Sequence, residues 1–131
     1  MVTRLVQITM KAPDDAALGR FWAAALGWGI DSEAPGITNL EPQGFVYPGP
    51  SAVCIDIVAS PEAKTAKNRV HIDIRPAGAP PWHPAERERL IRLKVQDLIA
   101  AGATKVREQY YGDEFGQVTL LDPEGNEFCV A

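Results

Sequence analysis

The stretch NRVHIDIR, residues 68–75, decides our interpretation of the fold. Its residues alternate strictly, so that Val70, Ile72 and Ile74 fall on one face of a predicted strand and the polar residues fall on the other. An antiparallel strand that faces water alternates in the same way, so the alternation alone predicts a strand and no site. The polar face, however, carries a histidine at position 71 between an arginine and an aspartate. This differs from the lysine- and glutamate-rich face of a solvated strand and marks a candidate site.

The composition indicates one ordinary globular domain. The chain has 131 residues, of which 46% are hydrophobic and 23% are charged. Its net charge of −4 argues against nucleic acid or an anionic membrane surface as a partner. Residues 1–10 lack the apolar region of a signal peptide, and no run approaches the ~20 apolar residues that a membrane span needs. Two cysteines are too few for a disulfide framework, so we expect a cytoplasmic protein.

The first half of the chain predicts a strand, a helix and further strands. Residues 4–11 alternate like the opening stretch, and Asp14 is a plausible N-cap of a helix that ends at Gly27. Apolar residues within this helix recur at helical spacing. Short strands are predicted at 28–32 and at 37–40 or 45–47, followed by a clearer strand at 52–58.

The second half predicts the same elements in the same order. After the strand at 68–75, Pro84 opens a helix that runs to about residue 101, with Gly102 as its C-cap. Strands are predicted at 104–111, 117–121 and 127–130. Gln7 then corresponds to His71. We therefore predict an α+β fold, a single domain of residues 1–131 made of two βαβββ modules, at about 1–60 and 68–131.

Four segments resemble one known superfamily. They are FWAAALGW (21–28), NRVHID (68–73), AGA (101–103) and DPEGNEF (122–128). In this order they resemble the glyoxalase-like branch of the vicinal-oxygen-chelate superfamily, which includes bleomycin-resistance and dioxygenase-type domains. The resemblance implies that the two modules form a cupped mixed sheet around a small-molecule cleft. It also implies a homodimer, because relatives often pair modules between chains.

The resemblance further implies a metal site. In metal-dependent relatives the ligands come from the first and last strand of each module, which here gives Gln7, Asp56, His71 and Cys129. Histidine and carboxylate suit Zn²⁺, Fe²⁺, Mn²⁺ or Ni²⁺. Such relatives, however, usually have a glutamate where this chain has Cys129, and the set of four mixes hard and soft ligands. The sequence therefore leaves two alternatives open: the protein binds a divalent metal, or it has no cofactor.

The catalytic and binding candidates each have a structural alternative. Glu127 lies two residues before Cys129 and is the acid–base candidate, together with Asp56. Asp56 interrupts an apolar strand, so it needs a cation, a metal or water nearby, since burial of an unpaired carboxylate costs several kcal/mol. His71 either acts in the site or hydrogen-bonds to Asp73 or a backbone carbonyl.

The remaining candidates are ligand-binding residues. Arg69 either steers an anionic substrate group or forms an ion pair with Asp73 or a neighbouring carboxylate. Trp28 and Trp82 either line the rim of the cleft or pack against the core. Cys54 faces the predicted cleft, as does Cys129, and both thiols are either inert or reactive.

Three functions remain open from the sequence. The first is a glyoxalase-like enzyme of lyase or isomerase type, which polarises a small oxygenated substrate while a carboxylate moves a proton. The second is a metal-free protein that binds an antibiotic or metabolite in an aromatic and apolar cleft. The third is a structural or regulatory member with no small-molecule role.

Overall fold

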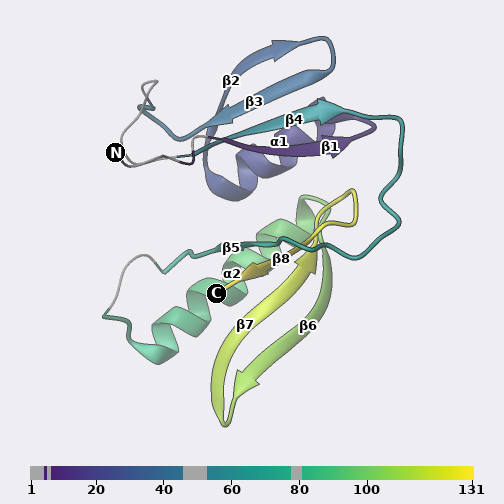
Figure 1. The fold of residues 1–131 in the computed structure, drawn as a ribbon. Coiled ribbons are helices and arrows are strands. Elements are labelled where there is room, and N and C mark those ends of the chain that lie inside the picture. Colours follow the sequence, from purple (N-terminus) through teal and green to yellow (C-terminus); the bar gives the residue numbers. More distant parts are fainter. Residues whose placement is uncertain (1–4, 6, 46–52, 78–80) are drawn as a thin grey trace. The chain divides into compact units, whose positions relative to one another are not determined.

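The computed structural model describes residue 5 and residues 7–45, 53–77 and 81–131. The chain divides into two compact units, residues 1–64 and 65–131, which are called the first and second module below. Figure 1 shows that each module contains one helix and its own group of strands.

The first module is a four-stranded mixed sheet with one helix. Its elements are β1 (Gln7–Ala12), α1 (Asp15–Leu26), β2 (Gly29–Ala34), β3 (Ile37–Glu41) and β4 (Cys54–Ala59). The sheet order is β1-β4-β3-β2, in which β1 and β4 are parallel and the other pairs are antiparallel. The first and last strands of the module are therefore neighbours.

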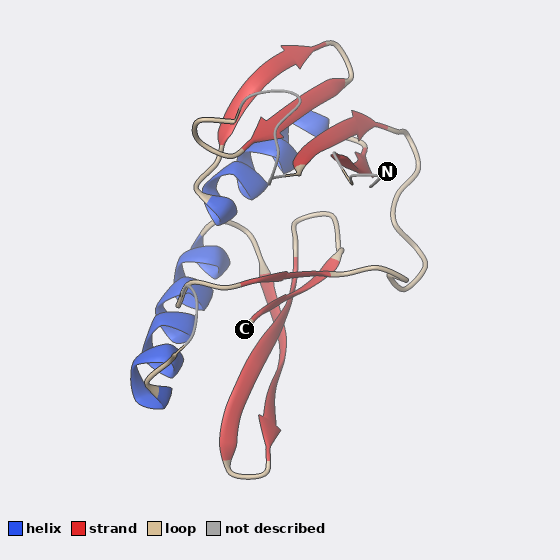
Figure 2. Cartoon of the chain, turned by 60° about the vertical axis from the view of Figure 1, so that its left-hand side comes forward, coloured by secondary structure: helices blue, strands red, loops and turns tan. Residues whose placement is uncertain are grey.

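The second module repeats this topology. Its elements are β5 (Ile72–Ile74), α2 (Pro84–Ala100), β6 (Thr104–Tyr111), β7 (Glu114–Leu121) and β8 (Glu127–Val130). The sheet order is β5-β8-β7-β6, again with a parallel pair between the first and last strands. Figure 2 shows the long β6–β7 hairpin of this module. The α+β fold with two βαβββ modules is confirmed, and the described strands form two four-stranded sheets without a closed barrel.

Helix α1 forms where the sequence predicts it. The side chain of Asp14 accepts a hydrogen bond of 3.0 Å from the Ala17 N–H, which satisfies one of the free donors of the first turn. Gly27 ends the helix with φ of 68°, a left-handed conformation that glycine adopts without steric cost. The buried side of α1, which includes Phe21 and Trp22, packs against β3 and β4.

Helix α2 is also close to its predicted bounds. Pro84 occupies the first turn, where its missing N–H has no helical partner to lose. The helix buries Ile91, Val95 and Leu98 and contacts β6, β7 and β8. Its C-cap is Ala101, and the predicted cap Gly102 is the next residue, with φ of 115°. Neither described helix combines the length and apolarity that crossing a membrane would require.

The opening strand is shorter than predicted. Regular pairing covers only Ile72–Ile74, because β8 offers three partners, Phe128 to Val130, to this strand. Val70 was predicted to share a face with Ile72 and Ile74, but it is 76% exposed whereas Ile74 is buried. The Val70 carbonyl accepts a hydrogen bond from the Asn68 side chain in a bend. Strand β7, by contrast, begins three residues earlier than predicted. The predictions for residues 4, 6, 46, 47 and 52 lie outside the described residues.

Candidate functional site

The parallel pair β5–β8 brings three candidate residues together. Asp73 lies opposite Cys129 in the ladder, and Thr119 of β7 lies opposite Cys129 on its other side. Side chains that lie opposite each other in neighbouring strands share one face of a sheet. The alternate residues of β8, Phe128 and Val130, are buried on the other face. The alternation of β5 and β8 therefore groups polar side chains on a single face of the second module.

His71 connects the other two members of this group. Its Nε2 atom lies 3.2 Å from Oδ1 of Asp73 and 4.0 Å from Sγ of Cys129. The three donor atoms of His71, Asp73 and Cys129 all lie within 4.8 Å of one another. The side chains of His71 and Asp73 are about half exposed, whereas Cys129 is buried. Asp73 thus contacts His71 rather than Arg69, which was its other candidate partner.

The thiol of Cys129 has further polar neighbours on β7. The Gln117 amide nitrogen lies 3.5 Å from Sγ and can donate to it, and Oγ1 of Thr119 lies 3.4 Å away. A purely structural thiol usually has an apolar environment. Sequence analysis did not select Gln117 or Thr119, although they alternate with the buried residues Val118 and Leu120 on a predicted strand.

A nitrogen, an oxygen and a sulfur donor together fit a divalent metal. Zn²⁺ is bound in proteins by His, Asp or Glu, and Cys, and catalytic zinc sites use three protein ligands with one open position. A thiolate disfavours the hard ion Mn²⁺ relative to Zn²⁺. The group His71, Asp73 and Cys129 therefore has the chemistry of a zinc-type site, although sequence analysis had assigned Asp73 to ligand binding.

Glu127 lies at the start of β8, two residues before Cys129 and on the same face of the strand. Its Oε1 atom is 3.7 Å from Nζ of Lys67, and its side chain is 20% exposed. The position of Glu127 is compatible with proton transfer.

Three predicted residues of the first module, Gln7, Cys54 and Asp56, lie on the equivalent face of the other sheet. Gln7 donates a hydrogen bond of 3.3 Å from its amide nitrogen to Oγ1 of Thr9. Thr9 lies opposite Asp56 in the β1–β4 ladder. On the other side, the amide of Asn39 donates a hydrogen bond to Oδ1 of Asp56. Asn39 thus supplies the partner that a carboxylate in an apolar strand needs, and sequence analysis missed it because a cross-strand neighbour depends on register.

Trp28 lines a pocket in the first module. The pocket has a volume of about 480 Å³, and its lining also includes Phe45, Asp31 and Glu41. Loss of hydration and the nearby Asp31 and Asp56 carboxylates raise the pKa of Glu41. Cys54 is buried and lies opposite Gln7 in the β1–β4 ladder.

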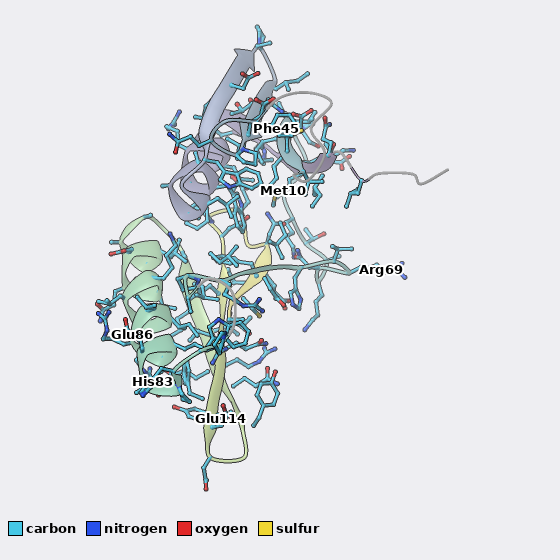
Figure 3. The ribbon with its side chains drawn as sticks, turned by 90° about the vertical axis from the view of Figure 1, so that its left-hand side faces the viewer. Met10, Phe45, Arg69, His83, Glu86 and Glu114 are labelled. Atoms are coloured by element: carbon cyan, nitrogen blue, oxygen red, sulfur yellow. The ribbon has the colours of Figure 1, made fainter. Side chains whose placement is uncertain are left out.

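Arg69 and Trp82 lie outside the donor group of the second module. Arg69 is exposed in the bend that precedes β5 and is labelled in Figure 3. Trp82 lies in the segment before α2, where the guanidinium groups of Arg75 and Arg87 lie over its ring.

Comparison with known proteins identifies relatives of this fold. A family model described as a glyoxalase-like domain matches residues 7–131. A search of curated proteins gave no significant match. A solved structure of a glyoxalase/bleomycin resistance protein/dioxygenase family enzyme from Burkholderia phytofirmans is 20% identical, with a TM-score of 0.72 over 98% of this chain and 97% of that chain.

Two further solved structures share this fold and belong to proteins with other described activities. The fosfomycin resistance protein FosX of Listeria monocytogenes, solved with Mn(II) and a dihydroxypropylphosphonic acid, is 14% identical, with a TM-score of 0.69. That match covers 99% of this chain and 90% of FosX. The oxidase ChaP-H2 is 19% identical, with a TM-score of 0.60 over 99% of this chain and 93% of the oxidase. At these identities the similarity shows the fold alone.

Proposed function

Because the chain belongs to the glyoxalase-like domain family of the vicinal-oxygen-chelate superfamily, we propose that it is a metal-dependent enzyme acting on a small oxygenated molecule. The reaction class we propose is lyase or isomerase chemistry. The observation that carries the proposal is the approach of three metal-ligating atoms, from His71, Asp73 and Cys129, to within 4.8 Å of one another. Asp73 and Cys129 lie in the first and last strands of one module, and His71 directly precedes the first of them, where the resemblance places ligands.

Six residues of the second module have roles in this proposal. His71, Asp73 and Cys129 would hold the ion, which when bound polarises a substrate oxygen and lowers the barrier to proton loss at the adjacent carbon. Glu127 moves the proton, since it lies on the same face of β8 as Cys129. Lys67, whose Nζ lies 3.7 Å from Oε1 of Glu127, would help to position this carboxylate. Arg69 remains a proposed contact for an anionic substrate group.

The first module contributes a second set of proposed residues. The side-chain amide nitrogen of Gln7 donates a hydrogen bond to Thr9, which leaves the side-chain carbonyl oxygen available to coordinate a metal. Oδ1 of Asp56 accepts a hydrogen bond from Asn39, which leaves Oδ2 available to coordinate a metal or to transfer a proton. We retain both as proposed ligands, with Trp28 and Cys54 as proposed substrate contacts. We also retain a homodimer in the cytoplasm as the proposed assembly and location.

The proposal predicts that the purified, untagged protein binds about one zinc ion per chain. Elemental analysis after incubation with Zn²⁺, Fe²⁺, Ni²⁺ or Mn²⁺ should give higher occupancy with Zn²⁺ than with Mn²⁺, because Cys129 is a soft ligand. His71→Ala should lose both the ion and any turnover of a substrate panel that includes hemithioacetals, catechols and fosfomycin. Its circular dichroism spectrum should stay that of the parent protein.

The chain offers a matched control for this experiment. His83 is the only other histidine, and as the N-cap of α2 it makes no capping hydrogen bond through its side chain. His83→Ala should therefore keep both metal and activity. Stoichiometric metal in His71→Ala, or no stoichiometric metal in the parent protein under any condition, would contradict the proposal.

A second candidate function rests on the pocket beside Trp28. A pocket of about 480 Å³ with Trp28 and Phe45 in its lining has the size and aromatic character of a small-molecule site. This observation favours a metal-free protein that binds an antibiotic or metabolite. Ligand binding that quenches Trp28 fluorescence and survives removal of metal by a chelator would favour this function over the enzyme.

A further inference from the structure

The second module contains another pocket, which none of the three metal-ligating candidates lines. It has a volume of about 480 Å³ and lies between Arg75, the first turns of α2 and the β6–β7 hairpin. Figure 3 shows Glu114 of that hairpin near the end of α2 that carries His83 and Glu86. The side chains that matter below are those of Arg75, Trp82, Arg87 and Tyr111.

Arg87 forms a fixed wall of this pocket. One terminal nitrogen of its guanidinium donates a hydrogen bond of 3.0 Å to the carbonyl of Phe115, and the other donates to the carbonyl of Gly116. The same group lies 5.9 Å from the centroid of the Trp82 ring. Arg87 therefore joins α2, the hairpin and Trp82, and each of its terminal nitrogens already donates a hydrogen bond within the protein.

Arg75 is the cation that remains for a ligand. Its guanidinium lies 4.9 Å from the centroid of Trp82, which holds the group at the pocket. Among the described residues no carboxylate forms an ion pair with Arg75, whereas Glu88, another lining residue, pairs with Arg92 at 2.8 Å. The guanidinium of Arg75 lies over an indole ring, and its planar set of N–H donors matches the two oxygens of a carboxylate.

We propose that this pocket binds a small aromatic carboxylate. The carboxylate pairs with Arg75, and the aromatic body packs against Trp82 and Tyr111, which supply apolar area at the pocket. The volume is in the range of small-molecule sites. Asp113 and Glu114, at the hairpin turn, also line the pocket, and because their carboxylates repel negative charge, a ligand with one carboxylate fits better than one with two. This site needs no metal and is independent of the proposed enzymatic function.

The test is a titration of the full chain with 3-phenylpropanoate, in which binding is measured by calorimetry and by tryptophan fluorescence. Binding should be saturable, and Arg75→Gln should weaken it about tenfold to a hundredfold, since hydrogen bonds to charged groups contribute about 1.5–3 kcal/mol. Arg107→Gln is the matched control, because Arg107 is an exposed arginine of the same module that does not line the pocket. This variant should bind like the parent.

Two related compounds and one further condition decide the remaining alternatives. The neutral alcohol 3-phenylpropanol and the cation 3-phenylpropylamine should bind at least tenfold more weakly than the acid. Binding of the acid should persist in His71→Ala and after chelation, which separates this pocket from the metal site. Absence of saturable binding, unchanged affinity in Arg75→Gln, equal binding of the amine, or loss of binding on chelation would each overturn the proposal.

Discussion

Gly19 shows how closely single residues of α1 pack against the first sheet. It is buried, and a methyl group at this position would lie 2.5 Å from Cγ2 of Thr38. Thr38 cannot easily rotate away, since its hydroxyl donates a hydrogen bond of 2.7 Å to Asp15. The glycine is thus required by space rather than by backbone conformation.

We predict that Gly19→Ala destabilises the protein despite the better helix propensity of alanine. Overpacking a core destabilises the folded state by about 1–3 kcal/mol. Alanine in place of glycine stabilises a helix by up to about 1 kcal/mol. The free energy of unfolding in urea should therefore fall by about 1–2 kcal/mol. Gly29→Ala is the control, because a methyl group there would meet no atom within 4 Å. A stabilised Gly19→Ala variant would show that the helix can move away from β3.

Single residues of the site were predictable to different degrees. His71 and Asp73 could be assigned to one face because they are two residues apart in an alternating stretch. Their contact with Cys129, which is more than fifty residues away, depends on the β5–β8 register. Asn39, Gln117 and Thr119 were missed for the same reason, since they become neighbours of candidate residues only across a ladder.

At the scale of secondary-structure elements, a charged network joins α2 to β6. Arg92 of α2 pairs with Glu108 of β6 and with Glu88 of its own helix, each at 2.8 Å. Lys105 reaches the same oxygen of Glu108 at 2.8 Å. Hydrogen bonds from Lys105 and Arg92 lower the pKa of Glu108 from 4.5 to about 2.

This network predicts a pH dependence of stability. A carboxylate whose pKa is depressed in the folded state stabilises it at every pH above the unfolded pKa, and this contribution is lost as the pH falls from about 4.5 to about 2. Thermal midpoints measured between pH 7 and pH 2 should therefore fall less steeply below pH 4.5 in Glu108→Gln than in the parent. Glu62→Gln, at an exposed position in the segment that connects β4 to β5, should follow the parent curve. Parallel curves for parent and Glu108→Gln would rule out this role.

Elements with strong local signals were predicted better than those defined by pairing. Each helix has a local start signal, the N-cap Asp14 for α1 and Pro84 in the first turn for α2, and an apolar side, so its bounds follow from short-range chemistry. The strand predicted at 68–75 alternates over its whole length, yet only three residues find partners on β8. Alternation thus indicates which face a residue occupies but not how far the ladder extends.

At the scale of the whole molecule, the repeat of one βαβββ topology is what makes the site interpretable. Both modules place their first and last strands side by side in parallel, so His71 and Cys129 have counterparts at Gln7 and Asp56. The order of elements was predictable from the sequence, because helix and strand patterns recur in the same succession. The sequence of the ligand strands does not reveal that Asp73 joins the donor group.

The most direct test of the metal site is Co²⁺ titration of the full chain, read by absorption spectroscopy. Co²⁺ replaces Zn²⁺ in sites with sulfur ligands, and a bound thiolate gives a near-ultraviolet charge-transfer band. If Cys129 binds the ion, this band should appear in the parent protein and also in Cys54→Ser. That variant removes the other cysteine of the chain, which lies in the first module. The band should be absent from Cys129→Ser. A band that persists in Cys129→Ser, or its absence from the parent protein, would contradict metal binding by His71, Asp73 and Cys129.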